Sequence, residues 1–113
     1  MKISKTFTAN IYVGFKEMDT GLIHTIDEVH DICKKYVDTI GLCVTITPTK
    51  YIYTNGNEPG ACIGLINYPR FPDTDENIEI KAIKLAELFL VTFRQFKVTV
   101  VMPDRTVMLE QEY

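Results

Sequence analysis

The feature that most constrains how this chain folds is a cluster of turn-forming residues near its middle. Residues 55–60 read Asn-Gly-Asn-Glu-Pro-Gly, and a run rich in β-branched and aromatic residues lies on each side, at 43–53 and 61–68. Two such runs joined by concentrated turn chemistry predict a β-hairpin. Pro48 lies inside the first run, and because proline cannot donate a ladder hydrogen bond, it predicts an edge strand or a bulge. The hairpin therefore gives two neighbouring antiparallel strands around which the rest of a sheet is arranged.

A helix is predicted immediately before the hairpin. Thr25 and Glu28 fit a capping box, in which the hydroxyl and the carboxylate satisfy free amide donors reciprocally. Gly41 is a natural residue to end the helix, and Leu42 is placed for the hydrophobic contact that accompanies this ending. Apolar residues recur between these signals at helical spacing, as expected for one buried face. They are Ile26, Val29, Cys33, Val37 and Ile40.

A second helix is predicted after the hairpin. Asp73, Thr74 and Asp75 are all competent to cap its N-terminus. Its buried stripe follows at helical spacing and consists of Ile78, Ala82, Leu85, Ala86, Phe89 and Phe93. Leu88, Leu90 and Val91 lie off this stripe, so the end of the helix is either enclosed or meets another subunit.

Three further strands are predicted at residues 5–13, 96–102 and 106–110, and the first shows clear period-two alternation. Residues 14–23 hold two glycines and three charges and are expected to form a loop. The order is βαββαβ with an extra C-terminal strand. The simplest right-handed arrangement is an α+β ferredoxin-like plait, with strand order 4-1-3-2 in an antiparallel sheet and both helices on one face. We expect residues 1–113 to form a single domain.

Composition weighs against several classes of partner. Hydrophobic residues make up 46% of the chain and charged residues 24%, as in a soluble globular protein. The net charge of −3 makes nucleic acid an unlikely partner, because binding its phosphates needs a basic surface. No apolar run is long enough to span a bilayer, and residues 1–5 lack the apolar core of a signal peptide. The three cysteines form no Cys-x-x-Cys pair, so we expect reduced thiols, a cytoplasmic location, and neither a metal site nor a cofactor.

The first candidate binding site is the loop that precedes the second helix. Residues 68–75 read Tyr-Pro-Arg-Phe-Pro-Asp-Thr-Asp, and Pro69 and Pro72 stiffen the backbone. The predicted topology brings Arg70 to the same end of the sheet as Arg105. Two guanidiniums near a helix N-terminus favour a phosphate or a carboxylate.

Aromatic residues complete this candidate site. Tyr68 and Phe71 could stack on a base or another ring, which makes a nucleotide-like anion the expected ligand. The alternative is structural: Arg70 pairs with Asp73 or Asp104, and Phe71 fills the bottom of the core.

A polar and aromatic rim at the opposite end is a secondary candidate, although turn residues are often required for backbone geometry alone. Its members are His24, Tyr51, Tyr53, Asn55, Asn57 and Glu58.

The uncovered sheet face is a third surface, rich in threonine and tyrosine and suited to pairing with another sheet. Its members are Thr6, Thr8, Asn10, Tyr12, Thr45, Thr47, Thr49, Tyr51, Ile66 and Val101. The RNA-recognition signature of alternating glycine and aromatic residues is absent from this face.

Catalytic patterns are weak. His24 and His30 are six residues apart and do not share a helix face. Cys33 follows His30 by three residues, but its place in the apolar stripe directs it to the core. Ser4 is the only serine, and it lies in the N-terminal arm.

These observations predict a non-enzymatic, homo-oligomeric protein that sequesters or senses a small anionic, nucleotide-like ligand. The principal alternative is a protein–protein interaction module or inhibitor that uses the same aromatic loops. A third possibility is an enzyme whose site is shared between subunits. In its general character, an acidic single domain without a catalytic signature, the chain is similar to small phage or mobile-element accessory proteins.

Overall fold

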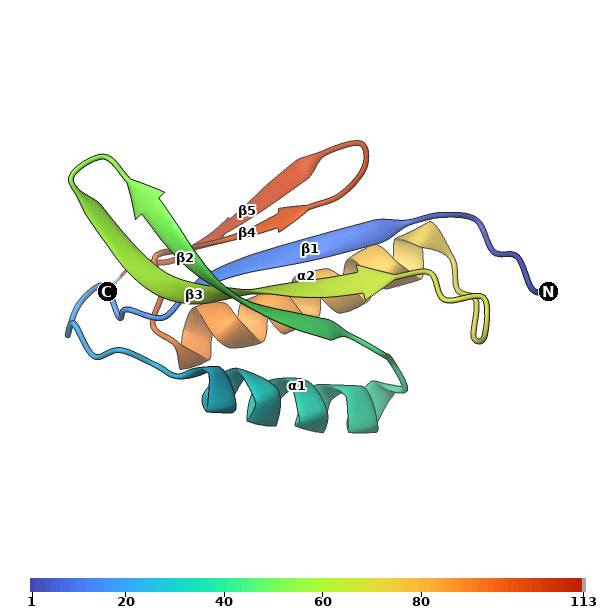
Figure 1. The fold of residues 1–113 in the computed structure, drawn as a ribbon, viewed down its shortest axis with the longest axis horizontal. Helices are drawn as coiled ribbons and strands as arrows, with labels where there is room; N and C mark the ends of the chain where they lie inside the picture. Colours follow the sequence, from blue (N-terminus) through green and yellow to red (C-terminus); the bar gives the residue numbers. More distant parts are fainter. Residues whose placement is uncertain (113) are drawn as a thin grey trace.

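In the computed structural model, which describes residues 1–112, five strands form one sheet and two helices cover one of its faces (Figure 1). In chain order the elements are β1 (Thr8–Gly14), α1 (Ile26–Ile40), β2 (Thr45–Tyr53), β3 (Gly56–Ile66), α2 (Asp75–Thr92), β4 (Lys97–Val101) and β5 (Thr106–Glu110).

The sheet is antiparallel throughout, with strand order β2-β3-β1-β4-β5. The predicted α+β class is therefore confirmed, and the last strand extends the sheet beyond β4. β1 lies at the centre and its alternating residues Ala9, Ile11 and Val13 are fully buried against the helices. The core thus lies between the helices and one face of the sheet.

The hairpin is tighter than its sequence predicts. Tyr53 pairs with Gly56, so only two residues make the turn, and Asn55 takes the left-handed conformation with φ 66°. The remaining turn-type residues belong to β3, which begins at Gly56 rather than at residue 61. Pro59 is tolerated there because β3 pairs with β2 alone before Gly60.

Pro48 lies on β2, which is an outer strand of the sheet, opposite Ala61 of β3. The edge position predicted from Pro48 is confirmed. An outer strand accommodates proline because the missing donor can face away from its single neighbour.

Both ends of α1 follow the sequence prediction. The Thr25 hydroxyl accepts a hydrogen bond from the Glu28 amide at 3.3 Å, and the Glu28 carboxylate accepts one from the Thr25 amide at 3.1 Å. Gly41 ends the helix with φ 69° and donates its amide to the Val37 carbonyl. This geometry explains why glycine is favoured at that position.

The second helix begins after Thr74, whose hydroxyl accepts from the Asn77 amide at 3.1 Å. All six residues of its predicted stripe are buried. Leu90 is buried as well, whereas Leu88 and Val91 remain exposed, so the apolar end of α2 is enclosed on only part of its circumference. Within residues 1–112, neither helix is long and apolar enough to cross a membrane.

Candidate functional site

The two arginines of the first candidate site are not joined by any contact in the described part of the chain. Arg105 forms a salt bridge with Glu79 of α2, and Arg70 is exposed. Figure 1 shows the β4–β5 turn and the loop before α2 toward the same end of the molecule but apart from one another. A binding pocket formed by both arginines therefore stays a prediction.

The aromatic pair of that loop is brought together. The rings of Tyr68 and Phe71 lie 5.5 Å apart between centroids, and Phe71 is 47% exposed. Phe71 thus does not fill the core, contrary to the structural alternative. Asp73 pairs with Lys81 at 2.8 Å rather than with Arg70, because α2 places Lys81 two turns along the helix.

The opposite end gathers the loop after β1, the β2–β3 hairpin and the turn after α2 (Figure 1). The Lys16 amide donates to the Glu58 carboxylate at 3.1 Å, which links the loop after β1 to the hairpin. The Gln95 amide group donates to the Lys16 carbonyl at 2.8 Å, which links the same loop to the turn after α2.

The secondary candidate residues do not form one cluster in this region. Tyr51 and Tyr53 lie on the uncovered face of the sheet, as does Glu58. His24 lies apart from them, stacked on Phe93 with ring centroids 4.2 Å apart. Asn55 forms the turn and Asn57 is an exposed residue of β3.

Three glycines create the room that these side chains occupy. A Cβ at Gly60 would collide with the Tyr51 ring, and one at Gly56 would collide with the Tyr53 ring. A Cβ at Gly14 would lie 2.8 Å from the Glu58 carboxyl group. The sequence signal for this arrangement is glycine inside a strand, which indicates close approach of another group.

We define the sheet-end site as Tyr12, Tyr51, Tyr53 and Glu58. The Tyr51 hydroxyl donates to the Ala61 carbonyl at 2.9 Å. Burial raises the pKa of Tyr51, and its nearby acidic neighbours, Glu58 among them, add to that rise. A neutral phenol next to a carboxylate and further aromatic rings is suited to holding a cationic group.

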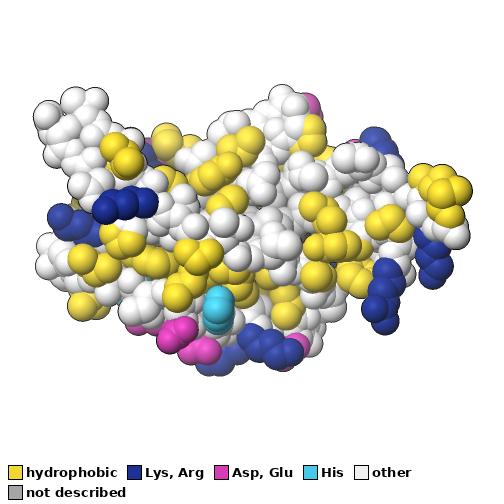
Figure 2. All heavy atoms as spheres, in the orientation of Figure 1, with side chains coloured by type: hydrophobic (Ala, Val, Ile, Leu, Met, Phe, Trp, Pro, Cys, Tyr) yellow, Lys and Arg dark blue, Asp and Glu magenta, His cyan; other side chains and the backbone are white. Residues whose placement is uncertain are grey.

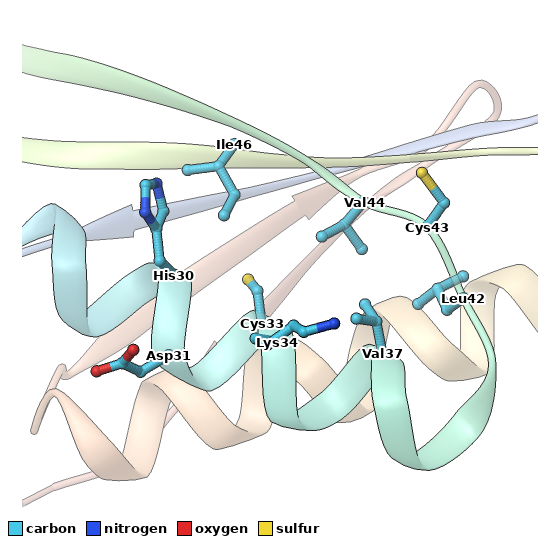
Figure 3. A pocket seen from close by; sticks show the side chains of 9 residues that line it. All are labelled: His30, Asp31, Cys33, Lys34, Val37, Leu42, Cys43, Val44 and Ile46. Atoms are coloured by element: carbon cyan, nitrogen blue, oxygen red, sulfur yellow. The ribbon is translucent and has the colours of Figure 1, made fainter.

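A groove between α1 and β2 is a separate cavity of about 620 Å³, within the size range of small-molecule sites. Cys33 and Val37 point from α1 toward Val44, and His30 points toward Ile46 (Figure 3). Burial raises the pKa of Cys33 to about 11, so its thiol stays protonated and is a poor nucleophile. Figure 2 shows apolar side chains gathered between α1 and the sheet, above charged side chains.

The groove had no sequence signal because its walls are ordinary stripe and strand residues. Its existence depends on how far α1 stands from the outer strand, which periodicity does not encode. Among the described residues, no group of three or more histidine, cysteine, aspartate or glutamate side chains could hold a metal ion.

No known protein family matches the chain, and no curated protein matches it. Two solved structures do match over nearly its whole length. A phage SAM lyase in complex with S-methyl-5'-thioadenosine is 18% identical, with a TM-score of 0.84, covering 100% of this chain and 95% of that one. A phage SAM lyase in the apo state is 20% identical, with a TM-score of 0.80, covering 95% and 90%.

These matches correct the prediction of function made from the sequence. Both structures are of an enzyme, which contradicts a non-enzymatic ligand-binding protein. The prediction went wrong because it relied on local catalytic motifs, whereas a site can be assembled from strand residues that form no motif. At 18–20% identity the likeness shows a shared fold, and the expected phage character and small-ligand partner are consistent with it.

Proposed function

We propose that this protein is a lyase that cleaves S-adenosylmethionine and releases methylthioadenosine. The observation that carries the proposal is the end-to-end structural match to a phage SAM lyase holding S-methyl-5'-thioadenosine. The expected nucleotide-like ligand then takes the form of an adenosyl thioether. We propose also that the fold is a ferredoxin-like plait with an added C-terminal strand.

The reaction breaks one carbon–sulfur bond. Methylthioadenosine retains the methyl and adenosyl groups of the sulfonium, so the bond that breaks joins sulfur to the γ-carbon of the aminobutyrate group. The bonding electrons remain on sulfur, which becomes a neutral thioether. An oxygen of the substrate's own carboxylate forms the new bond to the γ-carbon, so the aminobutyrate group leaves as a five-membered lactone and no water or added base is consumed. Because the sulfonium charge disappears, a site that held that charge tightly would stabilise the substrate more than the transition state.

The sheet-end site fits these requirements better than the groove. The α-ammonium group of the substrate keeps its charge throughout, and Glu58 offers it a carboxylate. The rings of Tyr12 and Tyr53 are exposed at different points of this face, and one of them can stack on the adenine. The groove instead carries Lys34 and His30 beside a single carboxylate, Asp31, and offers no aromatic ring other than the imidazole.

We propose further that the site is completed by a second copy of the chain on the uncovered sheet face. Two rows of paired residues cross all five strands on this face without a single charge. They are Thr47, Cys62, Tyr12, Thr99 and Met108, and Thr45, Gly64, Asn10, Val101 and Thr106. Such a surface can be buried against another sheet without desolvating an ionised group.

The lyase activity is tested by incubating the purified protein with S-adenosylmethionine and measuring methylthioadenosine by mass spectrometry. We expect product from the wild type and a loss of roughly 10- to 100-fold in kcat/KM for Glu58→Gln, as for a lost hydrogen bond to a charged group. Glutamine still accepts the Lys16 amide, so the fold is retained. Glu87→Gln, an exposed change on α2, is the matched control and should leave activity unchanged.

A thermal shift with methylthioadenosine separates binding from catalysis. A ligand that binds the folded state raises the melting temperature by mass action. Absence of both product and thermal shift would refute the proposal, whereas a shift without product would reduce it to adenosyl binding. If Glu87→Gln lost as much kcat/KM as Glu58→Gln, the role assigned to Glu58 would be wrong.

A further inference from the structure

His24 lies between two carboxylates at the junction of the loop after β1 and α1. Its Nε2 is 2.7 Å from Glu17 Oε2, and its Nδ1 is 2.6 Å from Glu28 Oε2. The side chains of His24 and Glu17 are 10% and 7% exposed, so solvent replaces neither contact readily. Both ring nitrogens therefore face a carboxylate oxygen at hydrogen-bond distance.

This geometry has a direct consequence for the protonation of the ring. A neutral imidazole carries one N–H, whereas the imidazolium carries two. Only the imidazolium can donate to Glu17 and Glu28 at the same time. The Phe93 ring lies parallel to His24 at 4.2 Å between centroids, a stacking that also favours a cation.

The hydrogen-bond partners of Glu17 keep its carboxylate ionised. Thr20 donates its hydroxyl to Glu17 Oε1 at 2.7 Å, and this bond, followed by the contact with His24, lowers the pKa of Glu17. Arg94 Nε is 3.8 Å from Glu17 Oε1 on the other side, and Arg94 also pairs with Asp19. The ionised Glu17 carboxylate thus faces His24 from the loop, the Glu28 carboxylate faces it from α1, and Arg94 is the cation beside Glu17.

His24 also closes the loop that holds Glu58. The His24 amide donates to the Phe15 carbonyl at 2.8 Å, and Lys16 forms an isolated bridge with Ile23. The Lys16 amide in turn donates to the Glu58 carboxylate. Loosening of His24 would therefore loosen the segment that positions Glu58.

We propose that His24 is a protonation-dependent latch, which as an imidazolium clamps the loop of residues 15–23 to α1 and thereby fixes Glu58. When His24 loses one proton, one ring nitrogen presents a lone pair to a carboxylate oxygen and that contact becomes repulsive. The loop then separates from α1. The latch acts on folding stability, so its test does not depend on whether the protein is a lyase.

The experiment uses the fact that the chain has two histidines. Urea unfolding of the full-length protein is measured between about pH 5 and 8.5, the range in which imidazole titrates. Because only the imidazolium can donate to both carboxylates, we expect the wild type to lose stability as pH rises through this range, by up to about tenfold in the folding equilibrium per pH unit. His24→Gln should abolish this dependence, and His30→Gln should retain it because His30 is exposed on α1.

Glu28→Gln removes one carboxylate while still satisfying the capping box, so its pH dependence should be weaker than that of the wild type. If His24→Gln does not fold, nitrogen-15 spectra of the two wild-type imidazoles decide the question. We expect His24 to keep both nitrogens protonated to a higher pH than the exposed His30 does. Loss of the His24 proton at or below the pH at which His30 loses its own, or parallel pH profiles for the wild type and His24→Gln, would overturn the latch.

Discussion

At the scale of single residues, Asp73 shows how one carboxylate connects the loop before α2 to the helix itself. It accepts from Lys81 Nζ at 2.8 Å, from Asn77 Nδ2 at 2.9 Å and from the Thr74 amide at 2.8 Å. The Lys81 hydrogen bond is the largest cause, and together these bonds lower the pKa of Asp73 to about 2. The stability that Asp73 contributes is present above the ordinary aspartate pKa and is lost as pH falls from about 4 to about 2.

We therefore expect Asp73→Asn to destabilise the protein by about 1 kcal/mol at pH 7, because the amide keeps an acceptor but not the charge. Near pH 2 the two proteins should be almost equally stable. Denaturant unfolding at both pH values measures the difference. An unchanged difference at pH 2 would mean that Asp73 acts through packing rather than through its charge.

At the scale of elements, the stability of α1 depends on its capping box because few of its side chains are buried. Only Val29 and Cys33 of this helix are buried, so end effects make up a larger share of its stability than in α2. We expect Thr25→Ala to cost about 1 kcal/mol, the usual loss for an N-cap hydroxyl. Thermal or urea unfolding provides the measurement.

Thr39→Ala is the matched control for this prediction. Thr39 lies on the exposed side of the same helix and its hydroxyl bonds back to the Lys35 carbonyl at 2.8 Å. Alanine has the higher helix propensity, so this substitution should be neutral or slightly stabilising. If both variants lose equal stability, the effect is one of threonine removal and not of capping.

The elements were predictable from the sequence where local chemistry determines them. Thr25, Glu28 and Gly41 defined α1 because capping and left-handed geometry select particular residue types. The boundary of β3 was wrong by five residues, since Asn55 alone supplies the positive φ and the neighbouring glycines serve side-chain packing instead. The pairing of Arg105 with Glu79 depends on how α2 lies relative to β5, and no local pattern carries that information.

At the scale of the whole molecule, the uncovered sheet face and the helical face differ in how they expose apolar residues. Ile66 is exposed on the sheet face and Leu88 on the helical face, to 41% and 44%. If subunits pair through the sheet, Ile66→Asp should shift the protein to a smaller assembly. Leu88→Asp, the same change on the opposite layer, should leave the assembly intact.

Size-exclusion chromatography with light scattering measures the mass of each variant. A monomeric wild type would contradict a site shared between subunits. If Leu88→Asp alone reduced the mass of the assembly, the interface would lie on the helices instead. The lyase assay on the same samples then shows whether activity follows the assembly.

Pro48 on the outer strand β2 bears on what kind of assembly is open to this protein. An open-ended filament of sheets requires every subunit to offer two complementary strand edges. One of the two edges here lacks a donor in its middle, so a neighbour that pairs along it meets an interrupted ladder. Growth by strand addition is thereby discouraged on that side, and association is directed to the uncovered face of the sheet. The position of one imino acid thus favours finite complexes over fibres.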